Sequence, residues 1–254
     1  MSLERSWRAL ELRIAPLERL VMAVASSLKP PKYYREYTDA GYRYEAPDVR
    51  HFCLLKAARV VSALNASVHL ARAGYVQEIA VLMRTVIECT THIEYVLDLD
   101  DSVAHTKAVE AYLRAFFEDA RRHSEAKIKK AQVPQGKVHE TIGRTLDEIA
   151  AACGDTKERK PAATLYSHVY RVFSNYVQAK YPECMDMYGG TPGHFHLKGM
   201  GGTPKDIENM EQIASSIETA SNAFVILIQQ LKLMDLLKDD KTLSAWYRER
   251  FERD

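Results

Sequence analysis

The sequence predicts an all-α fold, a single up-and-down bundle of several helices built on a central helical hairpin. Three observations support this prediction. Apolar residues recur every three or four positions over most of the 254 residues. Glycine and proline, at 11 and 9 residues, are scarce for this length. Stretches in which apolar and polar residues alternate, as in a half-buried strand, are rare.

The charge and cysteine patterns narrow the class of protein. Lys and Arg total 35 residues and Asp and Glu total 34, so there is no global attraction to nucleic acid or to an anionic membrane. The first residues lack an apolar signal core, and the longest apolar stretch, 223–237, is too short and too polar to span a bilayer. The four cysteines occur singly, without a C-x-x-C pair. We therefore expect a cytoplasmic protein with reduced thiols and no membrane association.

The central hairpin is predicted over residues 50–98, with its break at Gly74. Asp48 is expected to cap the first arm. The buried stripe of that arm contains Asn65, which would then be enclosed and need a hydrogen-bond partner. The second arm, 75–97, is apolar almost all round, which is typical of a helix at the centre of a bundle.

Arg84 and Glu88 on the second arm are four residues apart, so their side chains can pair. Because apolar residues flank them, we expect the pair to be partly enclosed, and enclosed charges need further hydrogen bonds. We predict that Arg84 contacts Glu88 and a polar group of a neighbouring helix, with Asn65 as one option. Together with Gln178, these three residues are the predicted binding residues.

The N-terminal region, residues 1–47, is predicted to form one helix and a tyrosine-rich strap. The helix covers residues 2–28, and Pro16 should kink it or split it in two. Five tyrosines follow within residues 33–47. We expect the strap to pack its rings over the hairpin. The alternative is that the rings stack on a ligand or on bases.

The remainder of the chain is predicted to be helical at 103–131, 138–152, 162–181, 204–238 and 241–254. The basic end of the first of these segments is read as a solvated helix face, with a nucleic-acid contact as the alternative. Thr203 should cap the long helix, and the final helix could cap the bundle or pack on a second copy. No linker looks long enough to separate two cores, so we expect one domain over residues 1–254.

A glycine-rich stretch, residues 188–204, separates two of these helices. Such long loops inside a compact domain are usually functional or mobile. His194 and His196 lie near its middle, and we expect the loop to border the deepest cleft. With Cys89 and His92, which are three residues apart on a helix, they could complete a zinc site. Such spacings often arise by chance, so we expect no metal and no cofactor.

A polar stripe is the better candidate for chemistry. On the predicted helix 162–181, His168, Arg171, Asn175 and Gln178 follow one another at spacings of three and four. Arginine binds phosphate through two parallel hydrogen bonds and a nearby imidazole can move protons, so this face could hold or cut a phosphodiester. The reading that we favour is a face that is solvated or turned to a second subunit. Hydrolase, nucleotide-binding and di-iron motifs are absent from the sequence.

Three segments resemble a bacterial family of uncharacterised all-helical proteins. They are ARAGYVQEIAVLMRTVIE in the hairpin, YSHVYRVFSNYVQAKYPE further along, and MYGG just after it. The resemblance covers roughly residues 50–235, and its motifs are the Arg84–Glu88 pair and the helix from Tyr166 to Pro182. It implies a helical bundle and says little about chemistry.

A more distant similarity is to the HEPN superfamily of helical bundles. Many of its members are homodimeric ribonucleases of toxin–antitoxin and phage-defence systems, with an active motif in which four to six residues separate an Arg from the His that follows it. In this sequence no His follows an Arg at that spacing. Gln178 stands where the imidazole would be needed after Arg171, and an amide cannot act as a base.

We therefore favour a non-enzymatic bundle that binds a protein or RNA partner, or itself as a homodimer, within a bacterial defence or stress module. The alternative is a HEPN-like, metal-independent ribonuclease that acts as a homodimer. Its catalytic groups would be drawn from His168, Arg171, Asn175, His194 and His196.

Overall fold

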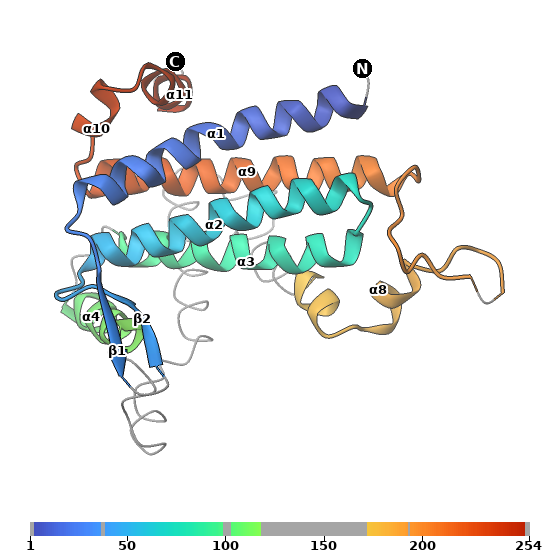
Figure 1. The fold of residues 1–254 in the computed structure, drawn as a ribbon, viewed down its shortest axis with the longest axis horizontal. Helices are drawn as coiled ribbons and strands as arrows, with labels where there is room; N and C mark the ends of the chain where they lie inside the picture. Colours follow the sequence, from blue (N-terminus) through green and yellow to red (C-terminus); the bar gives the residue numbers. More distant parts are fainter. Residues whose placement is uncertain (1–2, 37–38, 99–102, 118–171, 193, 252–254) are drawn as a thin grey trace, which may run out of the picture.

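The computed structural model describes residues 3–36, 39–98, 103–117, 172–192 and 194–251. Within these ranges the chain is helical apart from one short β-hairpin and the connecting loops, so the predicted all-α class is confirmed (Figure 1). The predicted helix 138–152 and the second half of the predicted helix 103–131 lie outside the described residues. The long helices are α1 (Leu3–Ser27), α2 (Val49–Arg72), α3 (Val76–Val96), α4 (Val103–Phe117) and α9 (Lys205–Gln230).

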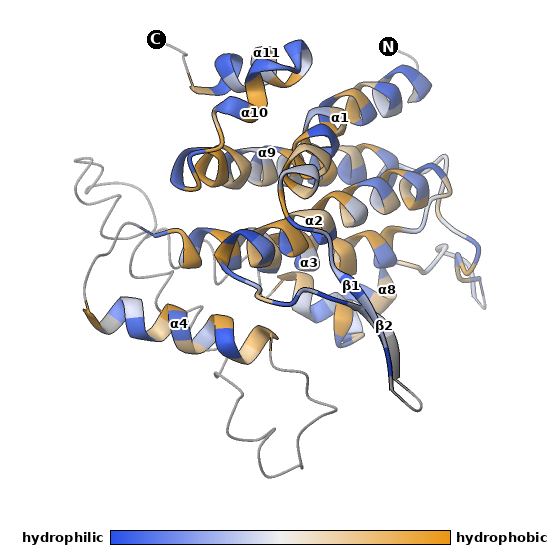
Figure 2. Ribbon diagram, turned by 60° about the vertical axis from the view of Figure 1, so that its left-hand side comes forward, coloured by the Kyte–Doolittle hydropathy of each residue, from blue (hydrophilic) through white to orange (hydrophobic). Residues whose placement is uncertain are grey.

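Four of these helices form the bundle. α2 and α3 are antiparallel neighbours joined at Gly74, as predicted, and α9 packs on both of them. α9 runs in the same direction as α3, and α1 packs on α2 and α9 (Figure 1). The hydrophobic faces of these helices turn toward one another (Figure 2). Asp48 caps α2 as expected, because its carboxylate accepts hydrogen bonds from the backbone N–H groups of Arg50 and His51.

α3 is the innermost helix of the bundle, as its apolar pattern predicts. Its buried side chains are distributed around the helix rather than along one stripe, and Ile79, Met83, Val86 and Ile93 are fully buried. In its first half, a strip that includes Glu78 and Val81 is exposed, and residues beside this strip, such as Thr85, are half-buried. A helix with buried residues around most of its circumference must have neighbours on several sides, and α2 and α9 both pack on α3.

Two helix boundaries differ from the prediction. Pro16 does not divide α1, which continues through it to Ser27. The predicted helix 204–238 ends at Gln230, because Lys232 adopts a positive φ of 55° and the chain turns before α10 (Asp235–Lys238). α11 (Lys241–Phe251) then packs against α1 and α9.

The polar-stripe helix also ends earlier than predicted. Its described part is helical over 172–177. Ala179 has a positive φ of 48°, which breaks the helix before Tyr181. Tyr181 and Pro182 therefore begin a short helix, α8 (Tyr181–Met185), instead of ending the previous one. Proline fits this place because the first residues of a helix have no intrahelical use for their N–H groups.

The tyrosine-rich strap is a β-hairpin instead of an irregular connection. Strand β1 (Lys32–Glu36) pairs antiparallel with β2 (Asp39–Arg43), and together they project from the bundle beside the start of α2 (Figures 1 and 2). Tyr33, Tyr34 and Tyr42 are exposed, so the expectation that the rings pack over the helical hairpin is wrong for these three. We call residues 32–43 the arm.

The glycine-rich loop docks on the turn between α2 and α3. The backbone N–H of Met200 donates to the carbonyl of Gly74 at 2.7 Å, and the Met200 side chain is buried. Gly74 has a φ of 78°, and a Cβ added there would lie 2.1 Å from the backbone nitrogen of Gly201. Gly199, with a φ of 96°, would place a Cβ 2.1 Å from the carbonyl oxygen of Ala73. Two glycines thus allow the two backbones to touch.

We predict that Gly74→Ala lowers the free energy of unfolding by about 2 kcal/mol or more, because the new methyl group meets backbone atoms that cannot rotate away. Urea denaturation measures the loss. Gly202→Ala is the matched control: Gly202 has a similar φ of 81° but nothing within 4 Å of an added Cβ, so only the backbone strain remains. Equal losses in the two variants would show that the loop does not dock at Gly74.

Candidate functional site

The Arg84–Glu88 pair forms on α3 as its spacing predicts. Arg84 Nε lies 4.0 Å from Glu88 Oε2, and their side chains are 26% and 22% exposed, so the pair is partly enclosed. On α2, the ammonium group of Lys56 lies over the rings of Phe52 and Phe116, at 5.6 and 5.1 Å from their centroids. The electrostatic field of an aromatic face attracts a cation at such distances.

Asn65 takes no part in this pair. It is half-buried on α2, and its amide nitrogen donates to Glu18 Oε1 of α1 at 2.6 Å. The proposed contact of Asn65 with Arg84 is therefore wrong, and so is its expected full burial. The physical reason is that α1 covers this face of α2, so a polar partner comes from the N-terminal helix.

The four residues of the hypothetical zinc set are separated in the structure. Cys89 and His92 are buried in the second half of α3, whereas the loop with His194 and His196 lies at the α2–α3 turn (Figure 1). At 1.5 Å per helical residue, Cys89 lies roughly 20 Å along the axis from that turn. Burial raises the pKa of the Cys89 thiol, which disfavours the thiolate that a metal needs. Among the described residues, no group of three potential metal ligands comes together.

Two of the four residues of the polar stripe, Asn175 and Gln178, lie among the described residues. His168 and Arg171 lie outside the described residues. Asn175 is half-buried, and Gln178 is exposed in the turn after the helix. The best-anchored side chain here is one that the stripe did not include. Tyr176 donates from its hydroxyl to Asp186 Oδ2 at 2.9 Å, while burial and this carboxylate raise the pKa of the phenol.

The two loop histidines meet each other. Their rings lie edge to face with centroids 5.0 Å apart, His194 being exposed and His196 half-buried. The backbone N–H of Gly189 donates to the carbonyl of His194 at 2.9 Å. An open pocket of about 340 Å³ lies elsewhere in the described part of the chain. Its lining combines the cap of α2 with the end of α4, namely Pro47, Asp48, Leu113, Arg114 and Phe117.

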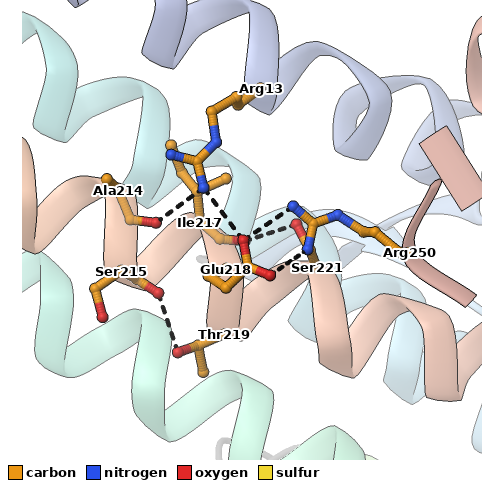
Figure 3. Close-up of polar contacts among 8 residues, drawn as sticks. All are labelled: Arg13, Ala214, Ser215, Ile217, Glu218, Thr219, Ser221 and Arg250. Atoms are coloured by element: carbon orange, nitrogen blue, oxygen red, sulfur yellow. Dashed lines mark hydrogen bonds and ion pairs between the residues drawn. The ribbon is translucent and has the colours of Figure 1, made fainter. Parts of the chain in front are cut away.

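A charged cluster that the sequence did not reveal joins three helices (Figure 3). Arg250 of α11 holds Glu218 of α9 with two hydrogen bonds of 2.6 and 3.0 Å. Arg13 of α1 reaches the same carboxylate at 3.2 Å and the carbonyl of Ala214 at 3.4 Å. Glu218 is half exposed, so solvent screens the cluster, and it is worth about 1 kcal/mol or less per pair. We read it as structural, since it fastens the last helix to the first.

The arm exposes three aromatic side chains, those of Tyr33, Tyr34 and Tyr42. Tyr33 and Tyr42 lie directly opposite each other, are 58% and 67% exposed, and meet edge to face with centroids 5.3 Å apart. Lys32 and Lys29 both bond Glu45 at the base of the arm, at 2.6 and 2.8 Å. The tyrosine count pointed to this segment, although its strand pairing did not emerge from the sequence.

Residues 50–188, which span more than half of the chain, match the model of a family of unknown function, DUF5677. The chain belongs to this family. The DUF5677 match begins in α2 and ends at Tyr188, so it contains α3, α4, α8 and the Arg84–Glu88 pair. The arm, α1 and the helices from α9 onward lie outside it. No curated protein and no solved structure matches the chain. None of the described helices has the length and apolar character needed to cross a bilayer.

Proposed function

We propose that this DUF5677 protein is a non-enzymatic binding protein of the cytoplasm, and that the arm is its contact surface. The observation that carries the proposal is the exposure of Tyr33, Tyr34 and Tyr42 on a hairpin that stands away from the bundle (Figure 1). A role within a bacterial defence or stress module is part of the same proposal and rests on the resemblance alone.

The physical chemistry of the arm supports a binding role. A two-stranded hairpin is marginally stable in water when nothing covers it. Tyrosine is enriched at protein interfaces because its ring buries a large area at a small entropic cost, while its hydroxyl keeps a hydrogen bond. Tyr33 and Tyr42 each carry such a ring and such a hydroxyl, and both side chains are exposed on the arm. A partner that covered these rings would stabilise the arm as well as the complex.

The test is affinity capture from a lysate of the source cells with three immobilised forms of the chain. The arm variant carries Tyr33→Ala and Tyr42→Ala. The control carries Leu12→Ala and Met22→Ala, which removes two α1 side chains of equal exposure, 61% and 66%. We expect the arm variant to retain its partner about tenfold less well than the wild type, and the control to match the wild type.

The proposal fails if the arm variant retains everything that the wild type retains. Chemical identification of what is retained separates a protein partner from RNA, which would absorb at 260 nm and disappear on ribonuclease treatment. The HEPN-like ribonuclease hypothesis makes a different prediction. Purified wild-type chain would degrade total RNA, and Arg171→Ala would abolish the degradation.

A further inference from the structure

The register of the arm places like charges opposite each other. Lys32 of β1 lies opposite Arg43 of β2, and Glu36 lies opposite Asp39. Residues directly opposite in an antiparallel pair are close neighbours, and like charges there are destabilising. At both ends of the arm, the register thus brings residues of like charge to opposite positions. Lys32 is compensated by Glu45, which lies beyond β2 at the base of the arm.

The same strand is complementary to a second copy of itself. When two β1 strands run antiparallel about a two-fold axis at Tyr34, position 32 of one faces position 36 of the other. Lys32 then meets the partner's Glu36 at both ends. Tyr33 faces the partner's Arg35, a pair suited to a cation–π contact. The charge order that is unfavourable within the arm becomes favourable between two arms.

The backbone geometry of β1 permits this pairing. The register leaves a turn of two residues between Glu36 and Asp39. In such a hairpin the pairs that exchange backbone hydrogen bonds begin at the turn and alternate along the ladder. Tyr33 and Arg35 fall in the other class, so their N–H and C=O groups point to the outer edge. No third strand pairs with this edge in the part of the chain that the structure describes.

We propose that two copies of this chain pair their β1 strands antiparallel, centred on Tyr34, into a four-stranded sheet. Tyr33 would then exchange two backbone hydrogen bonds with the partner's Arg35, and Arg35 two with the partner's Tyr33. The contact is isologous and closes as a dimer, which prevents the open edge from adding further copies. This inference rests on the proposed function of the arm as a contact surface and names its partner.

β1 is the pairing strand rather than β2 for a physical reason. A β2–β2 pairing would be centred on Gly41, which has no side chain to pack across the two-fold axis. β1 has Tyr34 at that place, and its ring is 38% exposed in the single chain. A strand of five residues gives a small contact, so we expect a dissociation constant on the order of 10–100 µM.

Charge exchange at positions 32 and 36 tests the pairing. Lys32→Glu alone and Glu36→Lys alone each place like charges opposite in the homodimer, and we expect each to weaken association about tenfold or more. A one-to-one mixture of the two variants places Glu opposite Lys at both ends, and we expect it to associate again. The double variant Lys32→Glu/Glu36→Lys should associate like the wild type. Sedimentation equilibrium over a concentration series measures all four.

The design separates the interface from the folding of the arm. Within one chain, Lys32→Glu faces Arg43 and Glu36→Lys faces Asp39, so each variant replaces a like-charge pair with an opposite-charge pair. Glu36→Lys therefore gives no reason to expect a weaker hairpin, whereas Lys32→Glu also loses the bond of Lys32 to Glu45 at the base of the arm. Lys29→Glu is the matched control, because Lys29 bonds Glu45 in a similar way but lies outside the strand. We expect this variant to leave the average mass in sedimentation equilibrium, and therefore the association, unchanged.

A wild-type chain that stays monomeric up to about 0.5 mM would overturn this inference. The inference would also be overturned if both single variants associated as strongly as the wild type, or if their one-to-one mixture failed to associate. If the wild type is monomeric while the Tyr33/Tyr42 variant still loses a captured partner, the arm is a contact surface for a different molecule and only the pairing falls. If the capture is also insensitive to the arm, both proposals fall together.

Discussion

Met83→Ala is expected to lower the free energy of unfolding by about 3 kcal/mol. Met83 is fully buried in the middle of α3, where α2 and α9 both pack against the helix. Truncation there removes the transfer free energy of the side chain and leaves a cavity that helices on two sides cannot easily fill. Alanine has at least the helix propensity of methionine, so any loss comes from packing. Chemical denaturation measures the difference.

Val81→Ala is the control for this prediction. Val81 lies two residues away on α3, on the strip that reaches solvent, and is 39% exposed. We expect a change within about 0.5 kcal/mol, as for most surface substitutions. If Met83→Ala and Val81→Ala cost the same, α3 does not occupy the centre of the bundle.

Glu94→Gln is expected to stabilise the protein at neutral pH, by up to about 3 kcal/mol. Glu94 of α3 is half-buried, and its sequence neighbours Ile93 and Tyr95 are buried. Burial raises the pKa of Glu94 from the ordinary 4.5 to about 7. The unfolded chain ionises this carboxyl near pH 4.5, whereas the folded chain resists ionisation until about pH 7. Ionisation therefore favours the unfolded state, and glutamine removes that cost.

The gain in stability of Glu94→Gln should depend on pH in a direction that the raised pKa determines. Below pH 4.5 the carboxyl is protonated in both states, so Glu94→Gln should be close to neutral. The gain should grow between pH 4.5 and 7 and then stay constant. Denaturant titrations at pH 4, 6 and 8 measure it, with Glu78→Gln, an exposed glutamate of the same helix, as the control. A gain that is the same at all three values would contradict the account.

The parts of the fold that depend on local pattern were predictable. The apolar residues around 75–97 predicted an inner helix, the four-residue spacing predicted the Arg84–Glu88 contact, and Asp48 predicted the start of α2. Each signal lies within one or two turns of helix, where side-chain spacing alone decides which groups meet.

The parts that depend on contacts between distant segments were not predictable. Asn65 bonds Glu18 because α1 covers that face of α2, and Glu218 bonds Arg13 because α1 and α9 touch. No periodicity connects such residues. The arm was missed for another reason. Its strands do not alternate apolar and polar residues as a half-buried strand does, and they lack an Asn-Gly or Asp-Gly turn.

The candidate site divides in the same way. Sequence reasoning selected the tyrosine-rich segment and the loop histidines from their composition. It could not tell that the rings of Tyr33 and Tyr42 face outward, because exposure is set by where the arm leaves the bundle. Nor could it tell that Gly74 and Gly199 hold the loop against the hairpin turn, because this requires two backbones far apart in sequence to touch.

We propose that a rigid bundle, with α3 at its centre, carries an arm that stands free of it until a partner covers it. Hydrogen exchange of the dilute chain, followed by mass spectrometry, compares the bundle and the arm in one experiment. We predict that amides of α3 around Met83 exchange slowest in the molecule and that amides of residues 32–43 are among the fastest. Exchange in α3 as fast as in the arm, or an arm protected as strongly as α3 at low concentration, would contradict it.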